Sequence, residues 1–238
     1  MKRETLILYR GPSKLTGEPI LAILQTSTDN AKTGALVSVT IVPDPSVARS
    51  VRPHASVCPS ACPFRDTGGC YVNWAFGPNA LQKAHGHKPE CTAREAREIS
   101  RGRTVRLGMA GDPAAVPMRI WRNLLTHAAG WVGYTHAWRD GRFRTLRDFC
   151  MASVESEAEA RDAHAAGWRT YRVRARGADT MHGEVDCPSA RGVQCVDCGL
   201  CSGSTGKAGS APSISIPAHG GAVASMVANR IAQEGATV

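Results

Sequence analysis

The sequence has no long hydrophobic run and no internal repeat. A membrane-spanning helix needs roughly 18–20 apolar residues, and no stretch approaches that length, so no membrane protein is expected. The apolar stretch at residues 6–9 is too short for the core of a secretion signal, which favours a cytoplasmic protein. Hydrophobic residues make up 42% and charged residues 21% of the chain, which is ordinary globular usage and excludes a disordered, collagen-like or coiled-coil protein.

Acidic residues are scarce relative to basic ones. The chain has 20 Asp and Glu against 29 Lys and Arg, a formal net charge of +9. Arginines concentrate at residues 101–106, 139–147 and 169–176, and residues 138–144 interleave them with Trp138 and Phe143. This pattern favours nucleic acid as a possible partner, bound through an Arg-rich surface. A solvated basic face is the alternative.

Short apolar segments alternate with helical patterns along most of the chain. A hairpin is expected from residues 5–10 and 20–25, followed by six strands at residues 35–42, 105–110, 131–136, 149–154, 169–174 and 213–218. Strand–helix alternation favours right-handed βαβ units. We therefore predict an α/β fold, a partial or open (β/α) TIM-like barrel of about six parallel strands with an N-terminal β-hairpin and a C-terminal Cys-rich loop.

The expected organisation is one barrel-like domain over residues 1–238. Within it we expect an N-terminal β extension (1–34), a first Cys loop (52–75) and a second Cys-rich insertion (187–211).

Three helices follow from local signals. Asp112 before Pro113 is a good N-cap, and the apolar stripe behind it consists of Val116, Ile120, Leu124 and Ala128. Ser156 and Glu159 form a capping-box pattern that opens a helix ending at Gly167. A last helix is expected over residues 222–234.

Cysteine is unusually abundant for a chain in which no secretion signal is expected. There are 9 cysteines, and in a reducing compartment so many thiols favour metal ligation over disulfides. Cys91 and Cys150 stand apart, and the other seven fall into two short windows. Cys150 lies among apolar residues, where a core position is expected.

The second window holds four cysteines: Cys187, Cys195, Cys198 and Cys201. The last three follow the spacing C-x2-C-x2-C, typical of ferredoxin runs in which each thiolate holds a separate iron of a cubane, and the remote Cys-Pro comes from upstream. Four thiolates also make a closed tetrahedral zinc site. The window thus predicts a metal site, either [4Fe–4S] or zinc.

The first window, Cys58, Cys62 and Cys70, offers three thiolates in one loop. Three ligands leave one iron of a cubane, or one face of a zinc ion, open to another ligand, which is typical of a reactive site. Cys91 could supply a fourth ligand and close the site. A purely structural metal knot is the other alternative.

This loop follows the first strand of the predicted barrel, and a Gly-Asp-Pro turn at residues 111–113 follows the second, an arrangement that resembles the radical S-adenosylmethionine (radical SAM) core. In that family three cysteines bind [4Fe–4S], whose open iron chelates S-adenosylmethionine for reductive cleavage to a 5′-deoxyadenosyl radical. The resemblance implies that Cys58, Cys62 and Cys70 bind the cluster, with Gly111 and Asp112 near the cofactor's amino group. The chain departs from the family in its wider cysteine spacing and in having Asp112 where the family has Glu.

The sequence also resembles uncharacterised Cys-rich proteins encoded by tailed bacteriophages. The resemblance lies in residues 70–72, 111–117, 133–136, 150–154 and 187–203. It implies a viral protein in the host cytoplasm and brings no activity with it.

Polar residues are expected at the carboxyl ends of the strands, where the chemistry of such barrels takes place. The candidates for acid–base work are Asp112, His136, Glu155 and His219. The glycines at His219-Gly220-Gly221 would let backbone N–H groups approach an anion, which makes His219 and Gly220 candidate cofactor contacts. Ordinary structural roles as a rim histidine, a helix-start carboxylate and a tight turn are the alternatives.

The leading hypothesis is a [4Fe–4S] protein on a radical-SAM-like partial barrel, with one or two clusters, S-adenosylmethionine as a possible cofactor and zinc as the alternative at the second window. It leaves open whether the protein is a divergent enzyme or a descendant that keeps its cluster for structure or redox sensing. The alternative function is a non-catalytic Cys-coordinated metal protein that binds nucleic acid.

Overall fold

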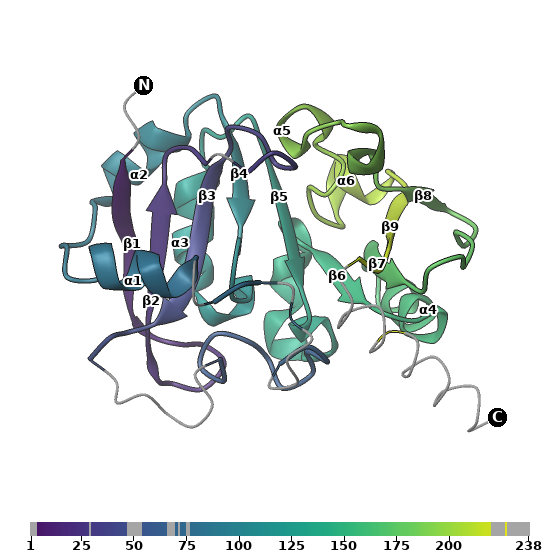
Figure 1. Ribbon diagram of the computed structural model, residues 1–238, viewed down its shortest axis with the longest axis horizontal. Coiled ribbons are helices and arrows are strands. Elements are labelled where there is room, and N and C mark those ends of the chain that lie inside the picture. The colour runs from purple at the N-terminus through teal and green to yellow at the C-terminus, as the bar shows by residue number, and fades with distance from the viewer. Residues whose placement is uncertain are drawn as a thin grey trace.

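A single nine-stranded sheet organises the protein. The computed structural model describes residues 4–28, 30–46, 54–65, 70, 72–74, 77–219 and 227. Within these residues the strand order is β1-β2-β3-β4-β5-β6-β7-β9-β8, seen from left to right in Figure 1. The strands are β1 (Thr5–Pro12), β2 (Pro19–Gln25), β3 (Val37–Pro43), β4 (Thr104–Leu107), β5 (Gly130–Thr135), β6 (Met151–Val154), β7 (Thr170–Arg174), β8 (Glu184–Asp186) and β9 (Ser213–Pro217).

The expected N-terminal hairpin forms, and it belongs to the main sheet. β1 and β2 pair antiparallel, with Ile7 opposite Ile23, and β2 pairs antiparallel with β3 in turn. The β extension expected over residues 1–34 therefore continues the same sheet.

From β3 onward the sheet is parallel, so the α/β class is confirmed. The six predicted strands all form as β3, β4, β5, β6, β7 and β9, and each pairs in parallel with the next along the chain. β8 adds a further parallel edge strand that the sequence reading missed, because three residues with two carboxylates carry no strand signal. Among the described strands β1 and β8 end the order unpaired, so the sheet is open.

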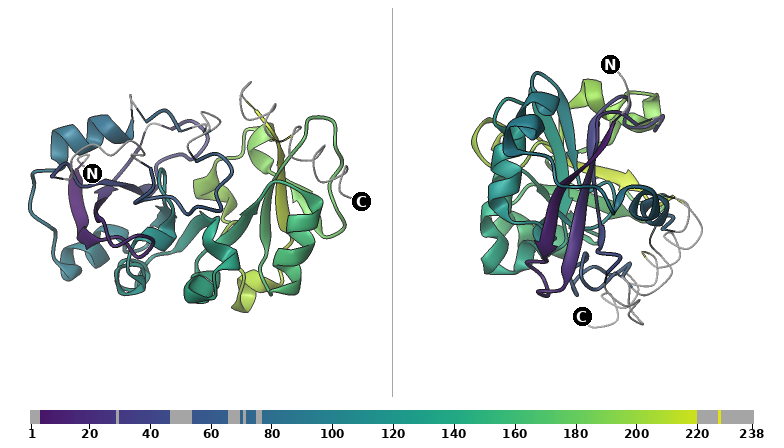
Figure 2. Two further views of the ribbon diagram at one scale, coloured as in Figure 1. Left: turned by 90° about the horizontal axis from the view of Figure 1, so that it is seen from below. Right: turned by 90° about the vertical axis from the view of Figure 1, so that its left-hand side faces the viewer.

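Helices cover both faces of the sheet. α2 (Ala93–Ser100) and α3 (Met118–Leu125) lie on one face and α1 (Pro78–His85) on the other, as Figure 2 shows in its right-hand view. Alternate strand residues explain this arrangement: Ile20 and Leu24 pack with Trp121 of α3, whereas Leu21 and Ile23 pack with Leu81 of α1. α4 (Glu157–Ala165) contacts β6 and β7, and the short α5 (Cys195–Cys198) and α6 (Gly206–Gly209) lie in the second Cys segment.

The helix expected after Asp112 is divided in two. Asp112 caps a 3₁₀ turn, Pro113–Ala115, by accepting a hydrogen bond from the Ala114 N–H at 2.9 Å. Pro117 then restarts the chain as the N-cap of α3, because proline cannot continue the preceding turn. The helix expected over residues 222–234 lies outside the described residues, apart from Val227.

Ser156 caps α4 as expected, accepting a hydrogen bond from the Glu159 N–H at 3.2 Å. The Glu159 carboxylate accepts instead from the Glu155 N–H at 2.8 Å, so the reciprocal half of the capping box is displaced by one residue. Across the described part of the chain, every helix is too short or too polar to span a bilayer.

Candidate functional site

Loops from four parallel strands meet at the carboxyl edge of the sheet. The loop after β3 carries the first three cysteines, and the loops after β4, β5 and β6 bring Asp112, His136 and Glu155. Parallel strands place such loops at one edge, as the sequence analysis expected. Residues 66–69 of the cysteine loop lie outside the described residues.

The thiols of Cys58, Cys62 and Cys70 lie close enough to affect one another. Burial raises the pKa of Cys58 well above its usual range, and Cys62, Asp112 and Cys70 raise it further. Burial also raises the pKa of Cys70, again with a contribution from Cys62. Thiols that raise one another's pKa in this way ionise together more readily when a cation compensates their charge.

N–H donors are directed at two of these sulfur atoms. The Cys70 sulfur accepts hydrogen bonds from the Val72 N–H and from the Trp74 side chain, both of which lower its pKa against the effect of burial. The Cys62 sulfur is hydrogen-bonded by the His136 ring. N–H groups that point at sulfur stabilise thiolates and orient metal ligands.

Asp112 joins the loops of this edge. Its Oδ1 accepts from Thr135 Oγ1 at 2.7 Å and its Oδ2 from the His136 N–H at 2.8 Å, in addition to the bond from Ala114. Its own N–H donates to the Val57 carbonyl, next to Cys58, at 2.7 Å. These bonds make Asp112 a structural anchor, and a contact to a cofactor's amino group stays a prediction.

Gly111 has φ +73°, and a Cβ there would lie 2.7 Å from the Ile41 carbonyl oxygen. The position therefore requires glycine for close approach to β3. A role for Gly111 beside a cofactor stays a prediction.

His136 and Glu155 form a buried pair beside the cysteine loop. His136 Nε2 lies 2.8 Å from Glu155 Oε1, and the Phe64 ring of the loop stands edge-on to the imidazole with centroids 6.2 Å apart. Burial alone would lower the pKa of His136, but Glu155 and Cys62 outweigh it and raise that pKa well above its usual value. Glu155 and Cys62 thus both favour the protonated form of the imidazole between them.

The second cysteine window packs against β5 and against the loop that precedes β3. The Cys195 N–H donates to the Lys32 carbonyl at 3.1 Å, and the Gly133 N–H of β5 donates to the Cys201 carbonyl at 3.1 Å. Burial raises the pKa of Cys201 to about 12. The Tyr134 hydrogen bond opposes this rise, while Cys187, Cys195 and Cys198 add to it, so these four thiols also lie near one another.

Arg169 fastens this segment to the sheet. Its buried guanidinium donates to the carbonyls of Gly203 at 2.8 Å, Leu200 at 2.9 Å and Pro212 at 2.5 Å. Gly203 has φ +113°, and a Cβ would lie 2.7 Å from the Asp148 carbonyl oxygen. Arg169 thus fixes the backbone on both sides of Cys201, at Leu200 and at Gly203.

Within the described residues the cysteine groups do not stand in coordination geometry: no three His, Cys, Asp or Glu side chains are placed as metal ligands. Cys91 is half-buried, and burial raises its pKa to about 11, with Glu95 as the next contribution. Cys150 is fully buried in the core. His219 lines a cavity, whereas Gly220 lies outside the described residues.

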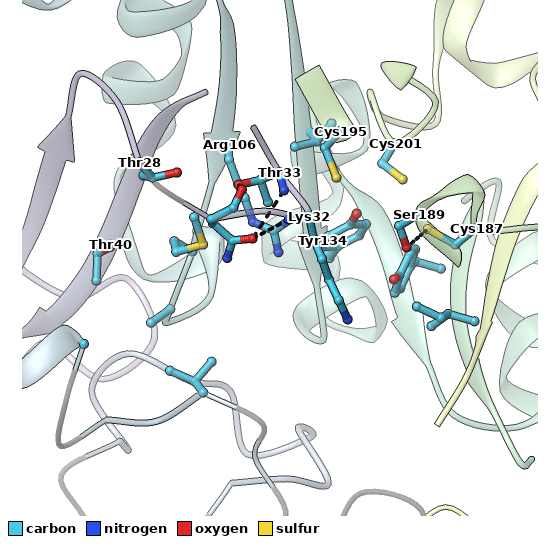
Figure 3. Close-up of a pocket in the computed structure, with 18 of the residues that line it drawn as sticks. Thr28, Lys32, Thr33, Thr40, Arg106, Tyr134, Cys187, Ser189, Cys195 and Cys201 are labelled. Carbon is cyan, nitrogen blue, oxygen red and sulfur yellow. Dashed lines mark hydrogen bonds between the residues drawn. The ribbon is translucent and has the colours of Figure 1, made fainter. Parts of the chain in front are cut away.

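A cavity of about 760 Å³ lies between the sheet and the second cysteine window. Figure 3 shows Cys187, Cys195 and Cys201 on one side of it and Thr28 and Thr40 on the other. Arg106, Tyr134 and Tyr171 line it from β4, β5 and β7 and were not among the predicted site residues. The alternation of side chains along a strand could have indicated them, because Arg106, Tyr134 and Tyr171 point to the other face of the sheet from their neighbours Leu107, Thr135 and Thr170.

Several arginines counted toward a basic surface are instead internal. Arg172 is 1% exposed and pairs with Glu184 through two hydrogen bonds at 2.9 and 2.7 Å. Arg174 pairs with Asp186, and Arg169 is buried as described. The cluster at residues 169–176 therefore contributes little to a polyanion-binding face.

No protein-family model, curated protein or solved structure matches this chain.

Proposed function

We propose that the protein binds a [4Fe–4S] cluster through Cys58, Cys62 and Cys70 at the carboxyl edge of a radical-SAM-like partial barrel. The observation that carries this proposal is that Cys62 and Cys70 lie near enough to Cys58 to raise its pKa, and that N–H donors are directed at the sulfur atoms of Cys62 and Cys70. From β3 to β7 the parallel strands follow one another in chain order, as in a singly wound barrel, and only β8, at the edge beyond β9, departs from that order.

The donor set suits an iron–sulfur group. Thiolates are soft ligands that favour Fe–S clusters and zinc over hard cations, and a cation would relieve the mutual rise of the thiol pKa values. Because metal binding and folding are coupled, we expect the loop to close its thiols around the group when it binds.

The surrounding residues have separate tasks. Val72 and Trp74 donate to the Cys70 sulfur and fix its orientation, and His136, held by Glu155, donates to Cys62. Asp112 holds the loop ends in place through Thr135 and Val57. When bound and reduced, a cluster with one open iron supplies one-electron reduction of S-adenosylmethionine.

The second window is proposed as a second metal site held by Cys187, Cys195, Cys198 and Cys201, either [4Fe–4S] or zinc. Its support is the mutual effect of the four thiols on the pKa of Cys201 and the Tyr134 hydrogen bond to that sulfur. A closed set of four thiolates would then have a structural or electron-transfer role.

Anaerobic reconstitution with iron and sulfide tests the proposal, followed by electron paramagnetic resonance of the reduced protein with and without S-adenosylmethionine. We expect a cluster signal that the cofactor alters, together with release of 5′-deoxyadenosine. The variant Cys62→Ala should lose the altered signal, whereas the matched control Cys91→Ala should keep it. A signal that the cofactor leaves unchanged would refute the open-iron site.

A second candidate is a non-catalytic metal protein that binds nucleic acid. Arg139 stacks on Trp138 at 4.0 Å, and Arg142 lies 5.2 Å from the Phe143 ring, a mixture suited to bases and phosphates. This candidate predicts affinity for single-stranded RNA or DNA that falls steeply with salt. A flat response to salt would remove it.

A further inference from the structure

The cavity between the sheet and the second cysteine window has a composition of its own. Its volume of about 760 Å³ is in the range of small-molecule sites. Strands that neighbour one another in the sheet contribute its floor, with Thr40 from β3, Arg106 from β4 and Tyr134 from β5. Because these side chains stand on sheet strands, the floor is rigid and largely pre-formed.

Positive charge is concentrated around the cavity. Lys32, Arg106 and His219 line it, and no Asp or Glu appears among the described residues of its wall. Lys32 and Arg106 carry this charge, because burial lowers the pKa of His219, and Lys32 and Arg176 lower it further, which favours the neutral imidazole. Apart from two tyrosines, the four thiols of the second window are the other ionisable side chains of the described wall, so an anion is attracted where Lys32 and Arg106 lie.

Two tyrosines give the same cavity an aromatic surface. The Tyr134 and Tyr171 rings lie 4.3 Å apart with a tilt of 41°, and the Arg106 guanidinium carbon lies 5.4 Å from the centre of the Tyr134 ring. A guanidinium beside an aromatic wall holds a planar ring and an anionic group at once. Side-chain amides of Gln25, Asn30 and Asn73 add donors and acceptors for the edge of such a ring.

We propose that this cavity binds a small anion built on a planar aromatic ring, of the class to which nucleoside monophosphates belong. Arg106 and Lys32 would hold the anionic group, and Tyr134 and Tyr171 would hold the ring. Any use of the ligand in a reaction rests on the proposed function. Binding of the ligand depends only on the residues of the cavity.

Three probes separate the two halves of this recognition. Adenosine 5′-monophosphate carries both ring and anion, adenosine lacks the anion, and ribose 5-phosphate lacks the ring. Isothermal titration calorimetry on the reconstituted protein at low ionic strength should give the tightest binding for the monophosphate. We expect roughly tenfold or more over adenosine, which loses a charge-assisted contact, and about tenfold over ribose 5-phosphate, which loses the aromatic stacking. Equal affinity for all three, or no binding by any, would overturn the proposal.

Variants assign the contacts. Arg106→Gln and the exposed-site variant Lys32→Gln should each weaken the monophosphate and leave adenosine unchanged, whereas Tyr171→Leu should weaken both ligands that carry a ring. Arg161→Gln, on the exposed face of α4 and outside the cavity wall, is the matched control and should have no effect. An equal loss in Arg161→Gln would show non-specific attraction and contradict the assignment.

Iron and sulfide are measured on the same samples. Ligand binding by protein without a cluster would refute the proposed function and support this inference. A full cluster content without ligand binding would refute this inference alone.

Discussion

The carboxylate of Asp112 accepts a hydrogen bond from the hydroxyl of Thr135 at 2.7 Å, with both side chains buried. The same carboxylate accepts from the backbone of Ala114 and His136, so it holds the loops after β4 and β5 in one arrangement. The loop that carries Cys58 is attached to this unit through the Val57 carbonyl. The candidate metal site is therefore built on a buried carboxylate.

Replacing Asp112 with Asn should destabilise the protein. The amide keeps one acceptor oxygen for Thr135 and Ala114, but its NH2 group would face the His136 N–H, donor against donor, and an unsatisfied buried group costs roughly 1–3 kcal/mol. Thr135→Val removes a single hydroxyl and should cost less, about 1 kcal/mol. Urea unfolding of both variants measures the difference, and a smaller loss in Asp112→Asn than in Thr135→Val would contradict the account.

The buried pair Arg172–Glu184 should be sensitive to the loss of either partner. Their side chains are 2% and 0% exposed, and leaving one buried charge alone costs about 3–5 kcal/mol. Arg172→Met and Glu184→Gln should each lower the free energy of unfolding by that order. Arg142→Ala, which breaks the exposed pair with Asp140, serves as the control and should change stability little. Comparable losses in all three variants would show that burial of the pair is not what matters.

Arg169→Met should release the segment that carries Cys201. The methionine fills similar space but donates no hydrogen bond to Leu200, Gly203 or Pro212. Hydrogen exchange followed by mass spectrometry should show faster exchange over residues 200–213 and unchanged exchange in the β1–β2 hairpin. Arg161→Met, on the exposed face of α4, is the matched control. Unaltered exchange at residues 200–213 would remove the anchoring role.

His164 should make stability depend on pH. Burial lowers its pKa, with an opposing contribution from Glu184, and its Nε2 lies 3.0 Å from Ser213 Oγ and 3.2 Å from Thr170 Oγ1. The unfolded chain, with a His pKa of about 6.5, takes up the proton before the folded protein does. Stability from this residue is thus present above that pH and lost as the pH falls below it.

The measurement is urea unfolding between pH 8 and 5, roughly the window around the ordinary His pKa. Wild-type protein should lose more stability across it than His164→Gln, which keeps hydrogen-bonding capacity but does not titrate. Parallel curves for the two proteins would show that His164 contributes nothing to the pH dependence.

Local signals were sufficient for most of the fold. The β-branched and apolar runs that became β3, β5 and β9 are buried in the sheet, and their positions followed from composition alone. α1 and α2 were missed because their sequences, PNALQKAH and AREAREIS, have few apolar residues to reveal a period. The division of the helix at Pro117 reflects a tertiary choice, in which the 3₁₀ turn keeps Asp112 buried against Thr135.

The cysteines of the candidate site could be predicted from the sequence, but the groups that hydrogen-bond to them could not. Cysteine spacing indicated both groups, since spacing is visible along the chain. The donors from Trp74 and Tyr134 depend on contacts across the fold, which no local pattern records. The arginines at residues 169–176 were predicted to be part of a basic surface for the same reason. The carboxylate that pairs with Arg172 is Glu184, which lies on β8, a strand that no sequence pattern indicated.

Iron and acid-labile sulfide content of anaerobically purified protein tests the central claim most directly. Wild-type protein and Cys91→Ala should contain both in equal amounts, and the triple variant of Cys58, Cys62 and Cys70 to Ala should lose about one cluster's share, since three thiolates hold one such group. Folded wild-type protein that takes up neither iron nor sulfide, even on reconstitution, would contradict the account.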